Sequence, residues 1–350
     1  MLALLGLLGV VMAGLAADAV MARPEEDIEG EAVEGAEPDG PAGAPQDATD
    51  EGHGDLLDWS VPQDAPDPAD EPVSSDTPPD LPGDLVLTGG DGVDGLSGEG
   101  GQDTVAGLDG GDFLLGRGGD DLLDGGAGDD HAWGGAGDDT ILGGDGRDVM
   151  QGEDGNDKID GGAGDDVLAG HEGADLLAGG EGQDALNGGA GADGLAGGAG
   201  DDGLSGGFGD DGLRGGAGAD TLDGNDGDDW LWGDDDDEAD FLNGGDGDDR
   251  LGIGNGDQAH GGEGADSFAL SDWIDAGDIA QIADYAPGLD EIVVIYDPAS
   301  HPDPQLSLVS APGSSDATLL LDGMPVAQVA GGAGLDLSAL RLVSTEQLAA

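Results

Sequence analysis

A single apolar position recurs every nine residues over much of the chain. When residues 89–232 are written in rows of nine, they give sixteen rows without an insertion or deletion, and the eighth residue of each row is apolar. It is Leu in eleven rows and Val, Ala, Ile or Met in the other five. Side chains alternate between the two faces of a strand. We therefore predict a three-residue strand at positions seven to nine, with position eight on one face and its neighbours on the other.

The rest of each row is typical of a tight turn. Positions one and four are Gly and position six is Asp in all sixteen rows, as in residues 161–169, GGAGDDVLA. Glycine permits positive φ and close approach of neighbouring backbones, so the first six residues suit a turn. If each turn reverses the chain, two rows form one coil of eighteen residues, and the coils stack as parallel strands about 4.8 Å apart. The predicted fold is all-β, a parallel β-roll (β-solenoid) of eight regular coils with a thin core of position-eight side chains.

In such a roll, the turns that stack on each other are eighteen residues apart. Asp94 should lie beside the turn of Asp112, and Asp103 beside the turn of Asp121. Each pair of stacked turns then offers carboxylates and outward-turned carbonyls to the gap between them. A flexible site with six or more oxygen donors suits Ca²⁺, whereas Mg²⁺ requires tight octahedral geometry and keeps its waters.

The repeated pattern G-G-x-G-x-D-x-U-x resembles the RTX (hemolysin-type) calcium-binding family, and the resemblance covers about half of the chain. In that family the sixth-position carboxylate and the turn carbonyls bind the metal. The resemblance therefore implies multiple Ca²⁺ ions as the cofactor. The aspartates that it implies as ligands are Asp94, Asp103, Asp112, Asp121, Asp130, Asp139, Asp148, Asp157, Asp166, Asp175, Asp184, Asp193, Asp202, Asp211, Asp220, Asp229, Asp249 and Asp266.

After residue 232 the repeat becomes irregular. The unit at 233–243 holds two extra residues, which we interpret as a bulged turn, and residues 244–251 return to the pattern. The next unit is short and has Gln258 where the ligand belongs, so no calcium is placed there. Residues 261–269 end the series. The whole roll is predicted over residues 85–269.

The charge of the chain predicts that folding of the roll depends on metal. With 80 Asp and Glu against 7 Lys and Arg, the formal net charge is −73. This charge excludes a nucleic-acid partner bound through its phosphates and disfavours an anionic membrane surface. Such a composition is also typical of disorder. We expect the repeats to be disordered without calcium and to fold as calcium binds. The chain has no Cys, which excludes disulfides and thiolate sites.

Two segments precede the roll. Residues 1–22 begin with an apolar run, and two interpretations remain open: a secretory signal peptide or a membrane anchor. Residues 23–84 are rich in acidic residues, Pro and Ala, with scarcely any apolar periodicity. That segment is predicted to be a disordered, extended linker.

Residues 270–350 follow a different pattern. Short β-rich runs separated by Pro, Gly and Asp predict strands at 279–283, 291–296, 305–309, 317–321, 325–329 and 340–343. We predict a small C-terminal β cap domain that covers the open end of the roll. By resemblance to RTX proteins, this end is also a candidate signal for type I secretion machinery.

The other chemistry-bearing residues form no recognisable catalytic or zinc motif. The five histidines are scattered, and no nucleophile-elbow, zincin or phosphate-loop pattern occurs. Trp133, Trp230 and Trp232 fall at outward-facing positions, either to cover the sheet or to contact a carbohydrate or partner. We expect a secreted or surface-displayed, non-enzymatic calcium-binding protein. The alternatives are a non-catalytic remnant or companion of a secreted RTX enzyme or toxin, and a surface adhesin.

Overall fold

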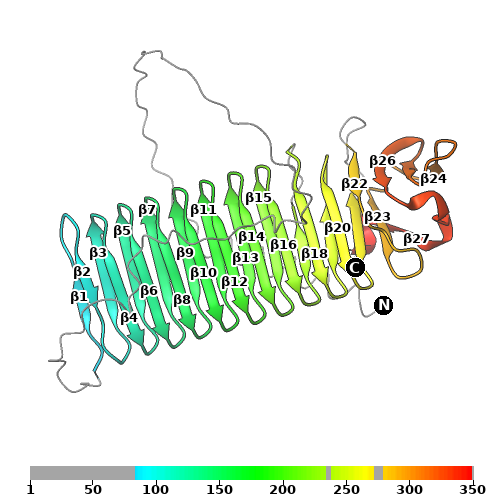
Figure 1. The fold of residues 1–350 in the computed structure, drawn as a ribbon. Helices are drawn as coiled ribbons and strands as arrows, with labels where there is room; N and C mark the ends of the chain where they lie inside the picture. The colour runs from blue at the N-terminus through cyan, green and yellow to red at the C-terminus, as the bar shows by residue number, and fades with distance from the viewer. Residues whose placement is uncertain (1–82, 234–237, 272–278, 349–350) are drawn as a thin grey trace, which may run out of the picture. The chain divides into compact units, whose positions relative to one another are not determined.

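Two long sheets form the two walls of one solenoid in the computed structural model (Figure 1). The structure describes residues 83–233, 238–271 and 279–348. The apolar segment 1–22 and nearly all of the predicted linker 23–84 lie outside these residues. None of the helices in the described part of the chain has the length and apolar character needed to cross a membrane.

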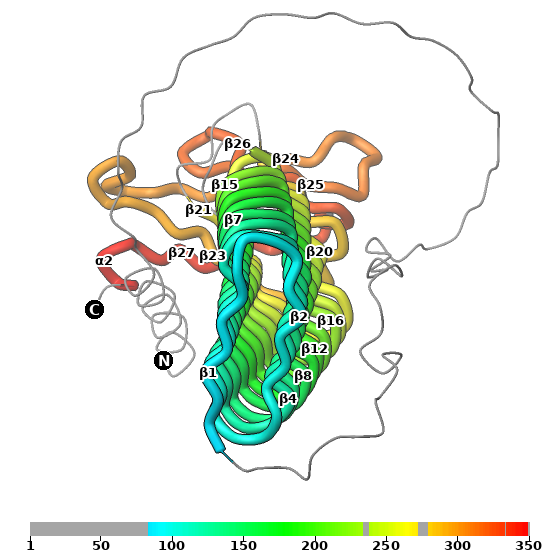
Figure 2. The backbone as a smooth tube through the Cα atoms, turned by 90° about the vertical axis from the view of Figure 1, so that its left-hand side faces the viewer, coloured from blue at the N-terminus to red at the C-terminus, as the bar shows by residue number. Residues whose placement is uncertain are grey.

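From β1 to β23, consecutive strands alternate between the sheets, so that each wall of the roll is built from every second strand (Figure 2). Sheet A has 13 strands, in spatial order β1 (Val86–Thr88), β3 (Thr104–Asp109), β5 (Leu122–Ala127), β7 (Thr140–Asp145), β9 (Lys158–Ala163), β11 (Leu176–Glu181), β13 (Gly194–Ala199), β15 (Gly212–Ala217), β17 (Trp230–Trp232), β19 (Arg250–Ile253), β21 (Ser267–Ser271), β23 (Glu291–Tyr296) and β27 (Leu340–Ser344).

Sheet B has 14 strands, in the order β2 (Gly95–Ser97), β4 (Phe113–Gly118), β6 (His131–Ala136), β8 (Val149–Asp154), β10 (Val167–Glu172), β12 (Ala185–Ala190), β14 (Gly203–Phe208), β16 (Thr221–Asp226), β18 (Phe241–Asp246), β20 (Gln258–Glu263), β22 (Ala280–Ile282), β26 (Met324–Val329), β25 (Ala317–Leu321) and β24 (Leu306–Val309). Pairing is parallel except among β24, β25 and β26. In the regular coils, paired residues are eighteen apart, as Leu168 and Leu186 are. The predicted parallel β-roll is confirmed.

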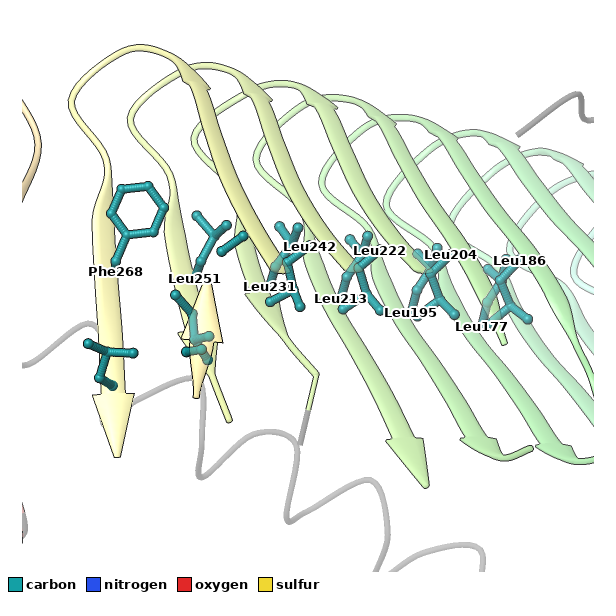
Figure 3. Close-up of a cluster of buried hydrophobic side chains, with 14 of the residues drawn as sticks. Leu177, Leu186, Leu195, Leu204, Leu213, Leu222, Leu231, Leu242, Leu251 and Phe268 are labelled. Atoms are coloured by element: carbon teal, nitrogen blue, oxygen red, sulfur yellow. The ribbon is translucent and has the colours of Figure 1, made fainter. Parts of the chain in front are cut away.

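The core is a double column of position-eight side chains between the sheets (Figure 3). Leu186, Leu204 and Leu222 come from sheet B, and Leu195 and Leu213 come from sheet A. All are nearly or completely buried. The same cluster continues past the repeats through Phe268 and Ile292 to Leu340, so one apolar core runs from the repeats into the C-terminal strands.

The strands are longer than the repeat pattern predicts. A typical strand spans six residues, because positions one to three of the next unit continue the strand begun by positions seven to nine. Only positions four to six form the turn. The prediction of a six-residue turn was therefore wrong, but the close approach of neighbouring backbones expected at the first glycine is present. At Gly161, which points inward, an added Cβ would lie 2.5 Å from Asp166 Oδ2 and 2.5 Å from the Gly179 carbonyl oxygen. Position one is Gly because no larger residue fits.

The two-residue insertion at 233–243 leaves the stacking intact. Residues 234–237 of the expected bulge lie outside the described residues, but pairing resumes with Phe241 opposite Thr221, twenty residues away. Leu242 then occupies the core position that Leu222 holds in the coil before. The extra length is therefore absorbed between strands.

All six strands expected after residue 269 are present, as β22 to β27. They do not stand apart from the roll. β23 pairs in parallel with β21 and β27, and β22 pairs in parallel with β20 and β26, so both sheets continue without a break. Sheet B ends in the antiparallel strands β26, β25 and β24. Short 3₁₀ turns at Gly332–Gly334 and Leu337–Ala339 and the helix α2 (Thr345–Leu348) complete the described chain.

The tryptophans cover the outer surface of the sheets. Trp133 is only 6% exposed and stacks on His131, which in turn stacks on Phe113. Trp230 and Trp232 stack on each other and are half-buried, and the Trp232 ring lies over Gly252. The expectation that these residues face outward was right for the strand position. Stacking between neighbouring side chains removes the rings from water, which agrees with the interpretation that they cover the sheet.

In the regular units from Leu108 to Asn225, position two of the repeat has a left-handed backbone. The residues that replace glycine there, Leu108, Arg117, Glu153, His171 and Asn225, have φ between 72° and 83°. A side chain with a Cβ costs about 1–2 kcal/mol in this region, whereas glycine costs about 0.5–1 kcal/mol in backbone entropy.

We therefore expect Glu153→Gly to stabilise the calcium-loaded roll, by roughly 0.5–1 kcal/mol. The matched control is Glu181→Gly, since Glu181 lies at position three without positive φ and its replacement should be destabilising. Thermal unfolding in saturating calcium distinguishes the two. Equal loss of stability in both variants would contradict the assignment of strain to position two.

Candidate metal centre

The sixth-position aspartates lie where each turn enters the next strand, and they stack along both edges of the roll. Of the aspartates predicted from the repeat, Asp94 in the first coil is half-buried, and the others are at most 4% exposed. Positions seven and eight of each unit continue directly into the sheet. The aspartate at position six therefore lies beneath the neighbouring turn and is buried. The sequence therefore placed these side chains correctly in the fold.

One carboxylate oxygen of each aspartate joins two coils. The Asp112 N–H donates to Asp130 Oδ1 at 2.7 Å, and the Asp130 N–H donates to Asp148 Oδ1 at 2.8 Å. The same bond recurs eighteen residues apart along both edges, as the sequence predicts. The separation becomes twenty residues at the insertion, where the Asp229 N–H donates to Asp249 Oδ1. The aspartates thus form a ladder of backbone-to-carboxylate hydrogen bonds.

The other oxygen of the carboxylate is buried without a partner. In the first coils Oδ2 still accepts a backbone hydrogen bond, as from the Glu99 N–H to Asp103. Farther along the ladder Oδ2 has no hydrogen-bond partner and almost no contact with solvent. This holds for Asp112, Asp121, Asp130, Asp139, Asp148, Asp157, Asp166, Asp175, Asp184, Asp193, Asp202, Asp211, Asp229 and Asp249. Buried polar atoms are normally paired, so each of these oxygens requires a cation or a proton.

The electrostatics of the ladder lead to the same conclusion. The pKa of Asp148 is raised to about 7, with burial as the largest cause; the hydrogen bond from the Asp130 N–H opposes the shift, and the negative charges of Asp130, Asp129 and Asp145 add to it. The pKa of Asp166 and that of Asp211 are also raised to about 7, with burial as the largest cause. Carboxylates that resist ionisation near neutral pH indicate a site built for a positive charge.

The turns also keep carbonyl oxygens available. In the turn Gly128-Asp129-Asp130, the Asp130 carbonyl accepts from the Val149 N–H, but the carbonyls of Gly128 and Asp129 accept no backbone hydrogen bond. In the described parts of the chain, no group of three or more His, Asp or Glu side chains gathers to hold a metal. The available donors are therefore carboxylate and carbonyl oxygens of stacked turns, a set that suits Ca²⁺. The buried, unpaired Oδ2 atoms fit this ion.

Three aspartates that the repeat pattern missed extend the ladder. The Asp220 N–H donates to Asp240 Oδ1 at 2.9 Å, and the Asp240 N–H donates to Asp257 Oδ1 at 3.0 Å. The Asp266 N–H donates to Asp290 Oδ1 at 3.2 Å. All three acceptor residues are buried.

The interpretation of Gln258 was therefore wrong. Gln258 is the first residue of β20, and Asp257 holds the sixth-position place because this unit is shorter than nine residues. Counting in nines shifts the register by one residue at this unit. A better signal is an Asp two residues before a buried apolar residue, which identifies Asp257 before Ala259 and Asp290 before Ile292.

A family model for the RTX calcium-binding nonapeptide repeat matches the chain in overlapping copies from residue 86 to residue 237. Residues 86–237 of this chain are RTX calcium-binding nonapeptide repeats. No curated protein matches the sequence. The RTX repeats bind several Ca²⁺ ions, and in this chain the sixth-position carboxylates and the turn carbonyls are the groups that would hold them. A bound ion supplies the positive charge that the stacked carboxylates lack.

The histidines lie away from the ladder. His301 Nδ1 is 2.6 Å from Asp322 Oδ2 in the C-terminal strands, and His260 packs against Phe241. Burial lowers the pKa of His131, which is stacked between Phe113 and Trp133. His171 lies in β10, at position two of its repeat unit, and is exposed. His53 lies outside the described residues.

Replacing one ladder carboxylate should weaken calcium binding. In Asp148→Asn the amide oxygen can still accept from the Asp130 N–H, but an NH₂ group replaces the unpaired oxygen. We expect this variant to bind fewer calcium ions per chain and to need more calcium to fold, as measured by isothermal titration calorimetry and circular dichroism. Asp145→Asn removes the same charge from an exposed position of the same unit and should change little. Equal effects of the two substitutions would show that only net charge matters.

The raised pKa values also predict how the calcium-free chain responds to pH. In the folded form, the pKa of Asp148, Asp166 and Asp211 is about 7, whereas the ordinary Asp value is 3.8. Between these values the folded form binds more protons than the unfolded form, so its stability rises as pH falls from 8 to 5. In the presence of a chelator, the β signal in far-UV circular dichroism should grow over this range. A β signal that stays constant or shrinks would contradict the burial of these groups.

Proposed function

We propose that this chain is an exported or surface-displayed protein whose β-roll folds when it meets calcium outside the cell, and that its purpose is structural or interactive rather than catalytic. The observation that carries the proposal is the row of buried carboxylate oxygens without partners, as in Asp130 and Asp166. A roll with these oxygens ionised and unneutralised is costly. A chain that holds them in register therefore depends on its cation.

Dependence on calcium suits a protein that is unfolded inside the cell and folded outside it. Cytosolic sensor sites bind Ca²⁺ at about 10⁻⁷–10⁻⁵ M, whereas extracellular modules bind it at about 10⁻⁴–10⁻³ M. The desolvation of many stacked carboxylates and the ordering of the turns both reduce the net affinity. We therefore expect folding at calcium levels found outside the cell.

The family resemblance supports export by type I secretion machinery that reads the C-terminal end of the chain. The apolar residues 1–22 then serve as a signal peptide or an anchor, which sequencing of the mature N-terminus would distinguish.

A non-enzymatic purpose is supported by the make-up of the described chain. Residues 86–237 are RTX repeats, and the strands that follow continue the same two sheets. A remnant or companion of a secreted RTX enzyme or toxin is an alternative with the same calcium chemistry. A surface adhesin is the second candidate, and a groove on sheet B, described below, favours it.

The test is a calcium titration of the full-length chain followed by far-UV circular dichroism. We expect a cooperative gain of β signal with a midpoint on the order of 10⁻⁴–10⁻³ M calcium, reversed by chelator, and little change with magnesium. Full β signal in the presence of chelator at pH 7.5, or no gain at several millimolar calcium, would refute calcium-dependent folding.

A further inference from the structure

An open groove of about 490 Å³ crosses four neighbouring strands of sheet B. These strands, β10, β12, β14 and β16, pair in parallel, so the groove runs along the stack of coils rather than along a strand. Figure 1 shows these strands side by side in the middle of the roll. None of the sixth-position aspartates lines the groove, which is therefore separate from the calcium ladder.

The position-two row forms the floor and the two ends of the groove. His171, Gly189, Gly207 and Asn225 lie in register on the four strands. The two glycines leave a hollow, and the side chains of His171 and Asn225 close it at either end. Three strand spacings separate His171 from Asn225, a distance of roughly 14 Å. This length suits a short linear molecule and not a folded domain.

The two sides of the groove differ in chemistry. Asn187 and Ser205, at position nine, form a polar side. The Ser205 Oγ accepts a hydrogen bond from Asn225 Nδ2 at 3.0 Å, which leaves the hydroxyl proton free to donate to a ligand. On the other side, at position three, Ala190 and Phe208 present an apolar surface, and Phe208 is 67% exposed.

We propose that this groove binds a neutral oligosaccharide segment. A sugar chain carries hydroxyls that both donate and accept hydrogen bonds, which matches the amide of Asn187, the hydroxyl of Ser205 and the amide oxygen of Asn225. The Asn225 NH₂ group already donates to Ser205 Oγ and to the Asp223 carbonyl. Its C–H face packs against an aromatic ring, which matches the exposed ring of Phe208. Amphipathic aromatic and amide groups around an open hollow are the combination that such a ligand needs.

Two other ligand classes fit less well. An extended peptide is usually held by backbone hydrogen bonds at a sheet edge, but β12 and β14 are paired on both sides and have none to offer. A cationic ligand would be attracted by Glu172 and Asp226, yet acidic residues recur at position three along the roll, as at Asp145 and Glu181. Because similar carboxylates recur along the roll, they would not favour binding of a cation at this groove over other positions.

The charge of the groove also limits the kind of sugar. Glu172 and Asp226 line it at opposite ends, and the whole chain has a formal net charge of −73. Both repel anionic glycans such as uronates or sulfated chains. The inference rests on the calcium-dependent folding proposed above, since the groove exists only when the four coils are stacked.

The test uses the full-length chain in saturating calcium, titrated by isothermal titration calorimetry. The neutral probes are cellotetraose, chitotetraose, maltotetraose and mannotetraose, and the competing probes are tetragalacturonate and tetralysine. The variant Phe208→Ala removes the exposed ring. Leu176→Ala is the matched control, because Leu176 is an apolar residue that is 55% exposed on the other sheet. Circular dichroism with calcium checks that all proteins fold.

We expect at least one neutral tetrasaccharide to bind, with affinity lowered roughly tenfold by Phe208→Ala and unchanged by Leu176→Ala. The inference is overturned if no neutral probe binds to the folded protein, if Phe208→Ala binds as well as the unaltered chain, or if tetragalacturonate or tetralysine is the preferred ligand. Because calcium-induced folding is measured in the same samples, a failure of sugar binding leaves the calcium proposal standing, and a failure to fold is seen separately.

Discussion

The carboxylate of each sixth-position aspartate is held between two coils by one oxygen and left without a partner at the other, and the rest of the roll depends on this arrangement. The Asp130 N–H donates to Asp148 Oδ1, while Asp148 Oδ2 is buried and unpaired. The first contact sets the eighteen-residue register. The buried, unpaired oxygen makes that register unfavourable until a cation or a proton neutralises it. A single side chain therefore sets the register of the fold and provides a buried oxygen that suits a cation.

The thin core explains why the ladder matters so much. Each regular unit contributes one large apolar side chain, such as Leu204 or Leu213, and most other positions carry glycine, aspartate or another small residue. Such a core buries little apolar surface in each unit. A cation held by the ladder would therefore add to the stability of the stacked coils. The same stacking creates the outer groove around Gly189 and Gly207.

The sequence predicts the roll, its leucine columns and the eighteen-residue partners because these follow from strict periodicity. It fails where geometry is not periodic. Asp257 was missed because a shorter unit shifts the count, and the crowding of Gly161 by Asp166 in the same unit and by Gly179 in the next coil follows only from the folded geometry. The groove beside Phe208 could not be predicted at all. The hollow forms only when four strands stack in register and bring two position-two glycines side by side.

Hydrogen exchange of the sixth-position amides tests the central claim most directly. In the full-length chain, the N–H groups of Asp112, Asp130 and Asp148 donate to carboxylates of the next coil. With calcium, mass spectrometry should show slow exchange for these amides throughout residues 103–249. In chelator at pH 7.5, exchange should approach that of an unfolded chain. Equal protection in both conditions would contradict the account, because the ladder would then hold without its cation.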